Sequence, residues 1–381
     1  MNTIRIRNGL TTKAHGTALT ALACLVLAAG CGSSGSDGSV EGNGKQTPSE
    51  EASVLKGTVG ASGGELVGQV GSALEGVKLT IPVGALAADT EIEIRPSSVA
   101  SSTPLPTTAV ECGPEFTISP AGLALAKPAT MTLPFDETTI TNNYRFDDEV
   151  KAWVLDGDKW SQRVQSDSSE GSVAIDLDAF STISAGVNPP AEEDLVQFDL
   201  YPNNAKIEKC FAGYPDDPKK QPSVHVVVVR GSQNDGLFLT GSNFKPGLQF
   251  DMFTVESSSL LSDGTPDPAF KNFGLAWYQS DLEASDKGRM HANIRTILLD
   301  QIFGFDPRVS LPPTGTFQVG FWFNNPKDAA DCGFDVTKPT PFNGEHQAGP
   351  LAMISVPDAD TGLGPLCTKP DTSTSPAHCS P

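Results

Sequence analysis

The sequence is short of cationic side chains, and this shortage bears on its partners. Its 381 residues contain 26 Lys and Arg against 46 Asp and Glu, a formal net charge of −20 at pH 7. Proteins that bind nucleic acid neutralise phosphates with clustered Lys and Arg, so we expect no nucleic acid partner. An anionic lipid surface would also repel the folded body, and the negative charge favours solubility.

The sequence also lacks the short motifs that mark common metal and phosphate sites. It contains no His-Glu-x-x-His, no Cys-x-x-Cys and no glycine-rich phosphate loop before a helix. The histidines after residue 200 are His225, His291, His346 and His378, and none has a partner at metal-ligand spacing. We therefore expect no cofactor and no metal. The alternative is a weak structural Ca²⁺ in an acidic loop such as residues 358–362, which matches only the first half of a calcium loop.

Long hydrophobic runs are missing as well. After residue 30 no apolar stretch reaches the roughly 18 residues that a membrane-spanning helix needs. Before it, residues 17–30 form a 14-residue apolar run that follows Arg5, Arg7 and Lys13 and no acid. A basic start, a short apolar centre and small residues at its end are typical of a secretory signal peptide. We predict that residues 1–30 are one.

The end of this run, Leu-Ala-Ala-Gly-Cys, resembles a bacterial lipobox with Gly30 before the cut and Cys31 after it. One departure is Ala28, where Leu is commoner. The resemblance implies cleavage before Cys31 and acyl chains on its sulfur and its new amine, which together are enough for stable anchoring. Residues 32–54 are rich in Gly and Ser and predict a flexible tether. The expected location is the bacterial cell envelope, and Gly32 favours the outer membrane in a Gram-negative cell.

Seven cysteines occur in the sequence, and five of them follow the tether. Export places those five in an oxidising compartment, where disulfides persist. Cys112 lies between Glu111 and Glu115, which disfavour a reactive thiolate, so we predict a small buried hydrophobe there. The other four predict two disulfides, with all three pairings open: Cys210, Cys332, Cys367 and Cys379.

Short segments of alternating polarity fill residues 55–188, and they predict half-buried strands. Apolar residues alternate with polar ones at 77–81, 91–95, 116–118, 129–133 and 172–187. Asp156-Gly157 predicts the tip of a hairpin, because this dipeptide adopts the positive φ angles of a tight turn. Strands at this spacing with turns between them indicate a β-sandwich.

Several of these segments also resemble the ZU-five domain of ankyrins, netrin receptors and tight-junction scaffolds. The resemblance rests on Gly63-Gly64, on Ile-Pro-Val-Gly-Ala-Leu at 81–86, on Gly-Pro-Glu-Phe at 113–116 and on residues 127–134. It implies a β-sandwich that serves as an interaction or spacer module. Some members of the family and its relatives cut themselves at His-Phe-Ser, and Ala179-Phe180-Ser181 corresponds to that step here. Because Ala179 replaces the base that would activate Ser181, we expect no self-cleavage.

Residues 195–367 predict a second, disulfide-bonded β-rich domain after a Pro-rich break at 188–194, and residues 368–381 predict a loose tail. The run Val226 to Val229 is typical of a strand covered on both faces. Alternate residues from Phe317 to Phe323 share one face and predict core. Three aromatic residues are candidates for facing a ligand, as a platform for a sugar: Trp277, Tyr278 and Trp322.

Taken together, the sequence predicts an all-β protein with two β-sandwich-like domains behind a lipid anchor. We expect a cell-envelope lipoprotein that acts as a non-enzymatic binding or structural module, with no catalytic residue identified. Its expected partners are the membrane, through Cys31, and an envelope protein or a glycan. Two alternatives stay open. One is an extracellular hydrolase that assembles His225, His291 and His346 with acids in a pocket of the second domain, and the other is a carbohydrate-binding adhesin.

Overall fold

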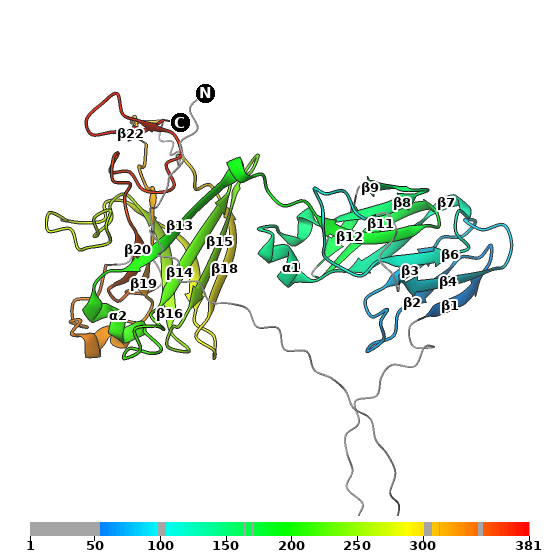
Figure 1. Ribbon diagram of the computed structural model, residues 1–381, viewed down its shortest axis with the longest axis horizontal. Coiled ribbons are helices and arrows are strands. Elements are labelled where there is room, and N and C mark those ends of the chain that lie inside the picture. The colour runs from blue at the N-terminus through cyan, green and yellow to red at the C-terminus, as the bar shows by residue number, and fades with distance from the viewer. Residues whose placement is uncertain are drawn as a thin grey trace, which may run out of the picture. The chain divides into compact units, whose positions relative to one another are not determined.

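Strands dominate the described part of the chain, and the helices there are short (Figure 1). The computed structural model describes residues 54–97, 104–163, 165–169, 171–300, 307–311, 313–341 and 346–380. The all-β prediction is confirmed. The predicted signal peptide, Cys31 and nearly all of the tether lie outside the described residues. No helix in the described ranges is long and apolar enough to cross a membrane.

Two antiparallel sheets, built from residues 55–187, form what we call the N-terminal sandwich. The first sheet runs β1 (Leu55–Val59), β4 (Thr90–Pro96), β6 (Phe116–Ser119), β12 (Thr182–Val187), β8 (Lys151–Asp156) and β9 (Lys159–Arg163), with β5 (Val110–Glu111) paired to β12. The second runs β10 (Gln165–Ser169), β11 (Ser172–Ala179), β7 (Ala124–Pro134), β3 (Lys78–Ile81) and β2 (Gly64–Val67). Helices α1 (Glu137–Asn142) and η2 (Asp147–Glu149) connect β7 to β8.

The core of the sandwich follows the alternation of its strands. Ala129, Met131 and Leu133 on β7 are fully buried between the sheets, while the side chains between them face outward. The stretch 172–187, which predicts one strand, is divided in two. The chain leaves the second sheet after Ala179 and enters the first sheet at Thr182, and Phe180 is buried between the layers at this crossing.

One eight-stranded antiparallel sheet, which we call the C-terminal barrel, contains the remaining long strands. Its order is β17 (Ala276–Glu283), β16 (Gln249–Val255), β19 (Gln318–Phe323), β20 (Leu351–Ser355), β13 (Leu195–Pro202), β14 (Ser223–Val229), β15 (Asp235–Ser242) and β18 (Met290–Thr296). The edge strands β17 and β18 lie beside each other, so the sheet curls until it is nearly closed. The short helices are η3 (Glu192–Asp194), α2 (Ala205–Phe211) and η4 (Pro326–Cys332). Residues 48–381 form one compact unit, and the boundary between two domains stays a prediction.

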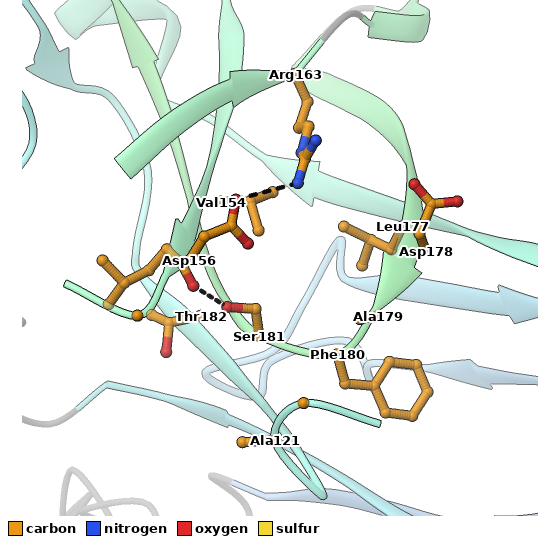
Figure 2. Close-up of a pocket in the computed structure, with 13 residues that line it drawn as sticks. Ala121, Val154, Asp156, Arg163, Leu177, Asp178, Ala179, Phe180, Ser181 and Thr182 are labelled. Atoms are coloured by element: carbon orange, nitrogen blue, oxygen red, sulfur yellow. Dashed lines mark hydrogen bonds and ion pairs between the residues drawn. The ribbon is translucent and has the colours of Figure 1, made fainter. Parts of the chain in front are cut away.

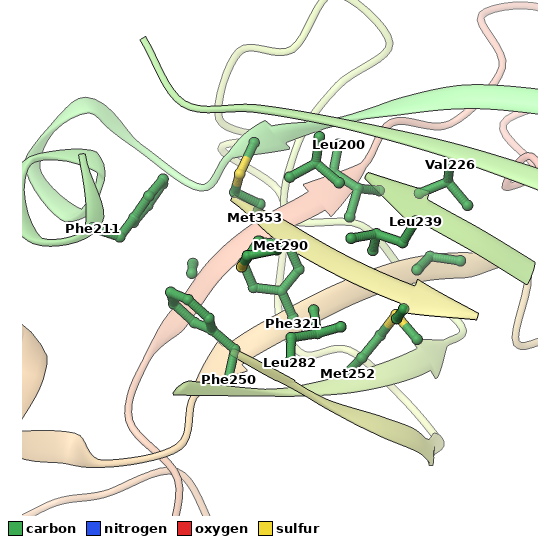
Figure 3. Packing of buried hydrophobic residues seen from close by; sticks show 14 of the residues in the cluster. Leu200, Phe211, Val226, Leu239, Phe250, Met252, Leu282, Met290, Phe321 and Met353 are labelled. Carbon is green, nitrogen blue, oxygen red and sulfur yellow. The ribbon is translucent and has the colours of Figure 1, made fainter. Parts of the chain in front are cut away.

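Aromatic rings and methionines fill the barrel (Figure 3). Phe250 and Phe321 are fully buried with ring centroids 5.0 Å apart, and Phe323 lies 5.2 Å from Phe250. This confirms that the face predicted from Phe317 to Phe323 is core. Both faces of β14 are buried as predicted: Val226 and Val228 face this core, and Val227 and Val229 belong to a separate apolar cluster.

The four candidate cysteines lie at disulfide distance in two pairs. Cys210 of α2 is bonded to Cys332 of η4, and Cys367 to Cys379. The predicted loose tail contains two short paired strands, β21 (Pro370–Asp371) and β22 (His378–Cys379). Because Cys379 is buried and bonded to Cys367, these final residues are held against the barrel.

A buried carboxylate reinforces that attachment. Asp300 is 5% exposed, and its Oδ1 accepts hydrogen bonds from the backbone N–H (2.8 Å) and hydroxyl (2.7 Å) of Thr368. Arg230 Nη2 donates to Asp300 Oδ2 at 3.1 Å. Burial alone would raise the pKa of Asp300, but the hydrogen bonds from Thr368 and the charge of Arg230 outweigh it and lower the pKa below its ordinary value.

We predict that Phe321→Ala lowers the free energy of unfolding by about 3–5 kcal/mol, because it removes a fully buried ring and leaves a cavity. Chemical denaturation monitored by circular dichroism measures this. Leu275→Ala, at a side chain that is 51% exposed, serves as the control and should change stability by at most about 0.5 kcal/mol. Equal effects of the two substitutions would contradict the packing described for β19.

We also predict that the Asp300 network weakens in acid. A carboxylate whose pKa is lower in the folded state contributes stability at any pH above its unfolded pKa of about 4, and this contribution is lost as the pH falls through the folded value. Asp300→Asn, which tolerates the left-handed backbone at this position (φ 67°), should lower stability at pH 7 and flatten the decline below about pH 4. Parallel pH profiles of the two proteins would refute the role of this charge.

Candidate functional site

A cavity of about 410 Å³ opens at one end of the N-terminal sandwich, between the ends of strands from both sheets (Figure 2). Its apolar wall contains the buried side chains of Val154, Leu177 and Phe180. The turn at residues 121–122 and the tip of the β8–β9 hairpin form the exposed rim. The predicted hairpin is confirmed, with Gly157 at φ 68° in its tip.

Several polar groups at this cavity form hydrogen bonds and an ion pair within the protein. Arg163 extends from β9 toward Asp156, and its Nη2 lies 3.2 Å from Asp156 Oδ2 (Figure 2). Ser161 Oγ donates to the same carboxylate oxygen at 2.8 Å. Ser181 Oγ donates to the backbone carbonyl of Leu155. The cavity therefore combines an apolar wall with one ion pair, a composition suited to contact with a partner's side chain.

Ser181 lacks the neighbours that a nucleophile requires. Its hydroxyl proton is directed to a carbonyl oxygen, which cannot serve as a base. Ala179 lines the cavity where a histidine would be needed, and none of the described histidines lines it. The geometry gives no means of activating this serine.

The three histidines that the hydrolase alternative needs do not meet in a pocket. His225 Nδ1 lies 2.8 Å from Asp199 Oδ1 on the barrel surface. His291 is in the same cross-strand row, but Thr240 lies between them, so the two imidazoles are about two strand spacings, roughly 10 Å, apart. His346 is elsewhere, against β16. Among the described residues, no three His, Cys, Asp or Glu side chains gather as a metal site.

His346 takes part in a buried polar cluster that joins three distant segments. The carboxylate of Asp251 on β16 is fully buried. Its Oδ1 accepts from Asn324 Nδ2 at 2.9 Å, and His346 Nε2 lies 3.2 Å from its Oδ2. Burying the polar side chain of Asp251 without hydrogen-bond partners would cost free energy. Its contacts with Asn324 and His346 offset that cost and hold the segment before β20 against the barrel.

The three candidate ligand-facing aromatics do not form a platform. The prediction that Trp322 faces a ligand is wrong, because its side chain is only 5% exposed. Its ring packs edge-on against Phe253 and Phe273, at 5.5 and 5.1 Å between ring centroids. Trp277 and Tyr278 are exposed, at 45% and 51%. They are consecutive residues of the edge strand β17, so their side chains leave opposite faces. A flat sugar ring could not stack on both.

Cys112 is a free cysteine, and it is buried as predicted. Burial, together with the negative charge of Asp136, raises the pKa of its thiol to about 12. The thiolate is therefore a negligible species at neutral pH, and this side chain belongs to the core rather than to a reactive site.

Sequence reasoning missed the buried acids Asp251 and Asp300. Asp251 stands in the apolar run Leu-Gln-Phe-Asp-Met-Phe, where an acid is the expected outward-facing residue of an alternating strand. Its burial results from Asn324 and His346, which are 73 and 95 residues away. Asp300 likewise meets Arg230 and Thr368, 70 and 68 residues away. No local pattern announces such partners.

Residues 55–146 match the family model of the ZU5 domain. The ZU5 domain is a protein–protein interaction domain. The match confirms the predicted resemblance from β1 through α1. Strands β8 to β12 and residues 179–181 lie beyond the matched residues. No curated protein matches the chain.

We predict that the chain stays intact at residues 179–181. Purified protein, incubated at neutral pH and analysed by intact-mass spectrometry, should show no fragment that ends or begins at Ser181, because no base activates its hydroxyl. Ser181→Ala should likewise show only the intact chain, at the mass expected for the loss of one oxygen atom. A fragment that appears in the parent and is lost in Ser181→Ala would overturn this interpretation.

Proposed function

We propose that this protein is a bacterial cell-envelope lipoprotein whose folded part binds another envelope protein without catalysing a reaction. Acyl chains on Cys31 fasten it to the membrane, and residues 32–54 act as the tether between anchor and folded part. The location is the outer membrane if the cell has one.

The anchor half of the proposal is supported by the first 54 residues. The basic start, the 14-residue apolar run and Leu-Ala-Ala-Gly-Cys occur in the order that lipoprotein processing requires. Residues 32–54 are dominated by Gly, Ser and charged or polar residues, which cannot bury enough apolar surface to fold. Such a segment allows a folded part to move away from the membrane by roughly 25 Å.

The binding half is carried by the ZU5 match at residues 55–146, since that domain mediates contacts between proteins. The acidic character of the chain, with 46 Asp and Glu, favours a partner whose contact surface is neutral or basic. A side chain of the partner can enter the cavity beside Ser181 and pack against its apolar wall. The dispersed aromatics of the barrel offer no comparable support for a glycan.

We predict that Cys31→Ser abolishes lipid attachment. Cells expressing the full chain are grown with an alkyne analogue of palmitate, and the protein is then isolated and tested for the label. The parent should carry label and sediment with membranes, whereas Cys31→Ser should carry none and remain soluble, because its hydroxyl cannot form the thioether.

Cys24→Ser is the matched control, since it changes a cysteine in the same apolar run but ahead of the cleavage site. It should keep the label.

Crosslinking of intact cells tests the binding half of the proposal, and it should join the parent to a protein of the envelope. The lipid anchor is refuted if the parent stays unlabelled. The binding role is refuted if crosslinking joins the protein to no other protein.

A further inference from the structure

The outer face of β14 and β15 carries an apolar patch that a segment of the same chain covers. Val227, Val229 and Phe238 point away from the barrel core, yet they are at most 5% exposed. Residues 144–149, which we call the clamp segment, lie over them. Tyr144 and Phe146 place their ring centroids 5.8 and 4.9 Å from that of Phe238. The patch is therefore buried by side chains from the far end of the ZU5-matched region.

A glycine makes room for this contact. Gly236 on β15 lies between Val229 of β14 and Arg295 of β18 in one cross-strand row. A Cβ atom at this position would come within 2.9 Å of Phe146 Cε2 and 3.1 Å of Phe238 Cε2. The backbone at Gly236 does not have a positive φ, so space rather than conformation requires glycine. The missing side chain leaves a hollow in the strand surface, and Phe146 occupies it.

Arg295, on the neighbouring strand β18, also contacts Phe146. Its guanidinium lies over the ring of Phe146, with Cζ 4.1 Å from the centroid. Its Nη1 and Nη2 donate to the two carboxylate oxygens of Asp148 at 2.5 and 2.6 Å, and Nη2 also lies 3.2 Å from Glu149 Oε2. A bidentate arginine–carboxylate pair fixes orientation as well as distance. Hydrogen bonding to Arg295 lowers the pKa of Asp148, so the pair stays charged at neutral pH.

The clamp segment is also ordered from within. The Phe146 backbone N–H donates to Glu149 Oε2 at 2.9 Å, and Arg145 Nη1 lies 3.3 Å from Glu149 Oε1. Arg145 Nε donates to the Asn188 carbonyl at 2.6 Å. These bonds hold the short helix η2 in shape, so little freedom is lost when Phe146 enters the hollow.

We propose that the clamp segment locks the N-terminal sandwich to the C-terminal barrel, so that both move as one rigid unit. The lock is a conformational device built from one aromatic side chain in a glycine hollow and one arginine over it. It keeps the apolar patch around Phe238 away from solvent. Since it consists of few residues and a partly exposed ion pair, it is closed at rest yet opens with a modest loss of contacts.

Hydrogen–deuterium exchange of the full chain, read by mass spectrometry, tests this lock. Arg295→Ala should speed exchange in peptides that cover the clamp segment and residues 233–240 by about fivefold. Gly236→Val, which fills the hollow, should speed it by about tenfold or more. Peptides from β7 and β19, deep in the two cores, should exchange as in the parent, because local opening leaves them folded. Arg289→Ala, at an exposed arginine before β18, is the control and should change nothing.

The proposal is overturned if clamp-segment exchange in both variants stays within about twofold of the parent. It is also overturned if Arg289→Ala speeds clamp-segment exchange as much as Arg295→Ala does, since the effect would then come from the loss of any positive charge. Should Gly236→Val expose β19 as well, Arg295→Ala and Asp148→Asn decide the matter, because both side chains are partly exposed and their loss leaves the cores intact.

Discussion

The alternation of side chains along each strand, which directs every second residue into a core, is the constraint on which the described structure depends. In the sandwich it brings Met131 and its neighbours on β7 between two sheets, and in the barrel it brings Phe250 and Phe321 together. Burial of these side chains supplies most of the favourable free energy of a fold that has little helix. The loops, the disulfides and the short final hairpin are attached to this framework.

Polar groups secure the parts that the strands do not reach. Asp300 ties the segment after Leu366 to Arg230, and Asp251 ties Asn324 and His346 to β16. Each carboxylate is buried, and each has hydrogen-bond partners that offset the loss of hydration. The acids therefore act as cross-links between distant segments.

The ZU5-matched region ends at Phe146, the residue whose ring enters the hollow at Gly236. The end of the matched region therefore packs against the outer face of β14 and β15. The cavity beside Ser181 lies beyond the matched residues, in strands that complete the same sandwich.

Much of this was readable from the sequence, because alternation and turn chemistry are local. The strands around Ile81, Ile94, Met131 and Phe321, the glycine of the β8–β9 hairpin and the buried state of Cys112 all follow from patterns within a few residues. The motifs spread over residues 63–134 were sufficient to indicate the ZU5 domain.

Tertiary structure alone decided which segments meet. The division of residues 172–187 at Phe180 depends on two sheets competing for one stretch of chain, and the burial of Trp322 depends on Phe253 and Phe273 from other segments. The pairing of four cysteines and the partners of Asp251, Asp300 and Arg295 likewise join positions 12 to 147 residues apart. Contacts at such separations depend on the path of the whole chain, which no short pattern encodes.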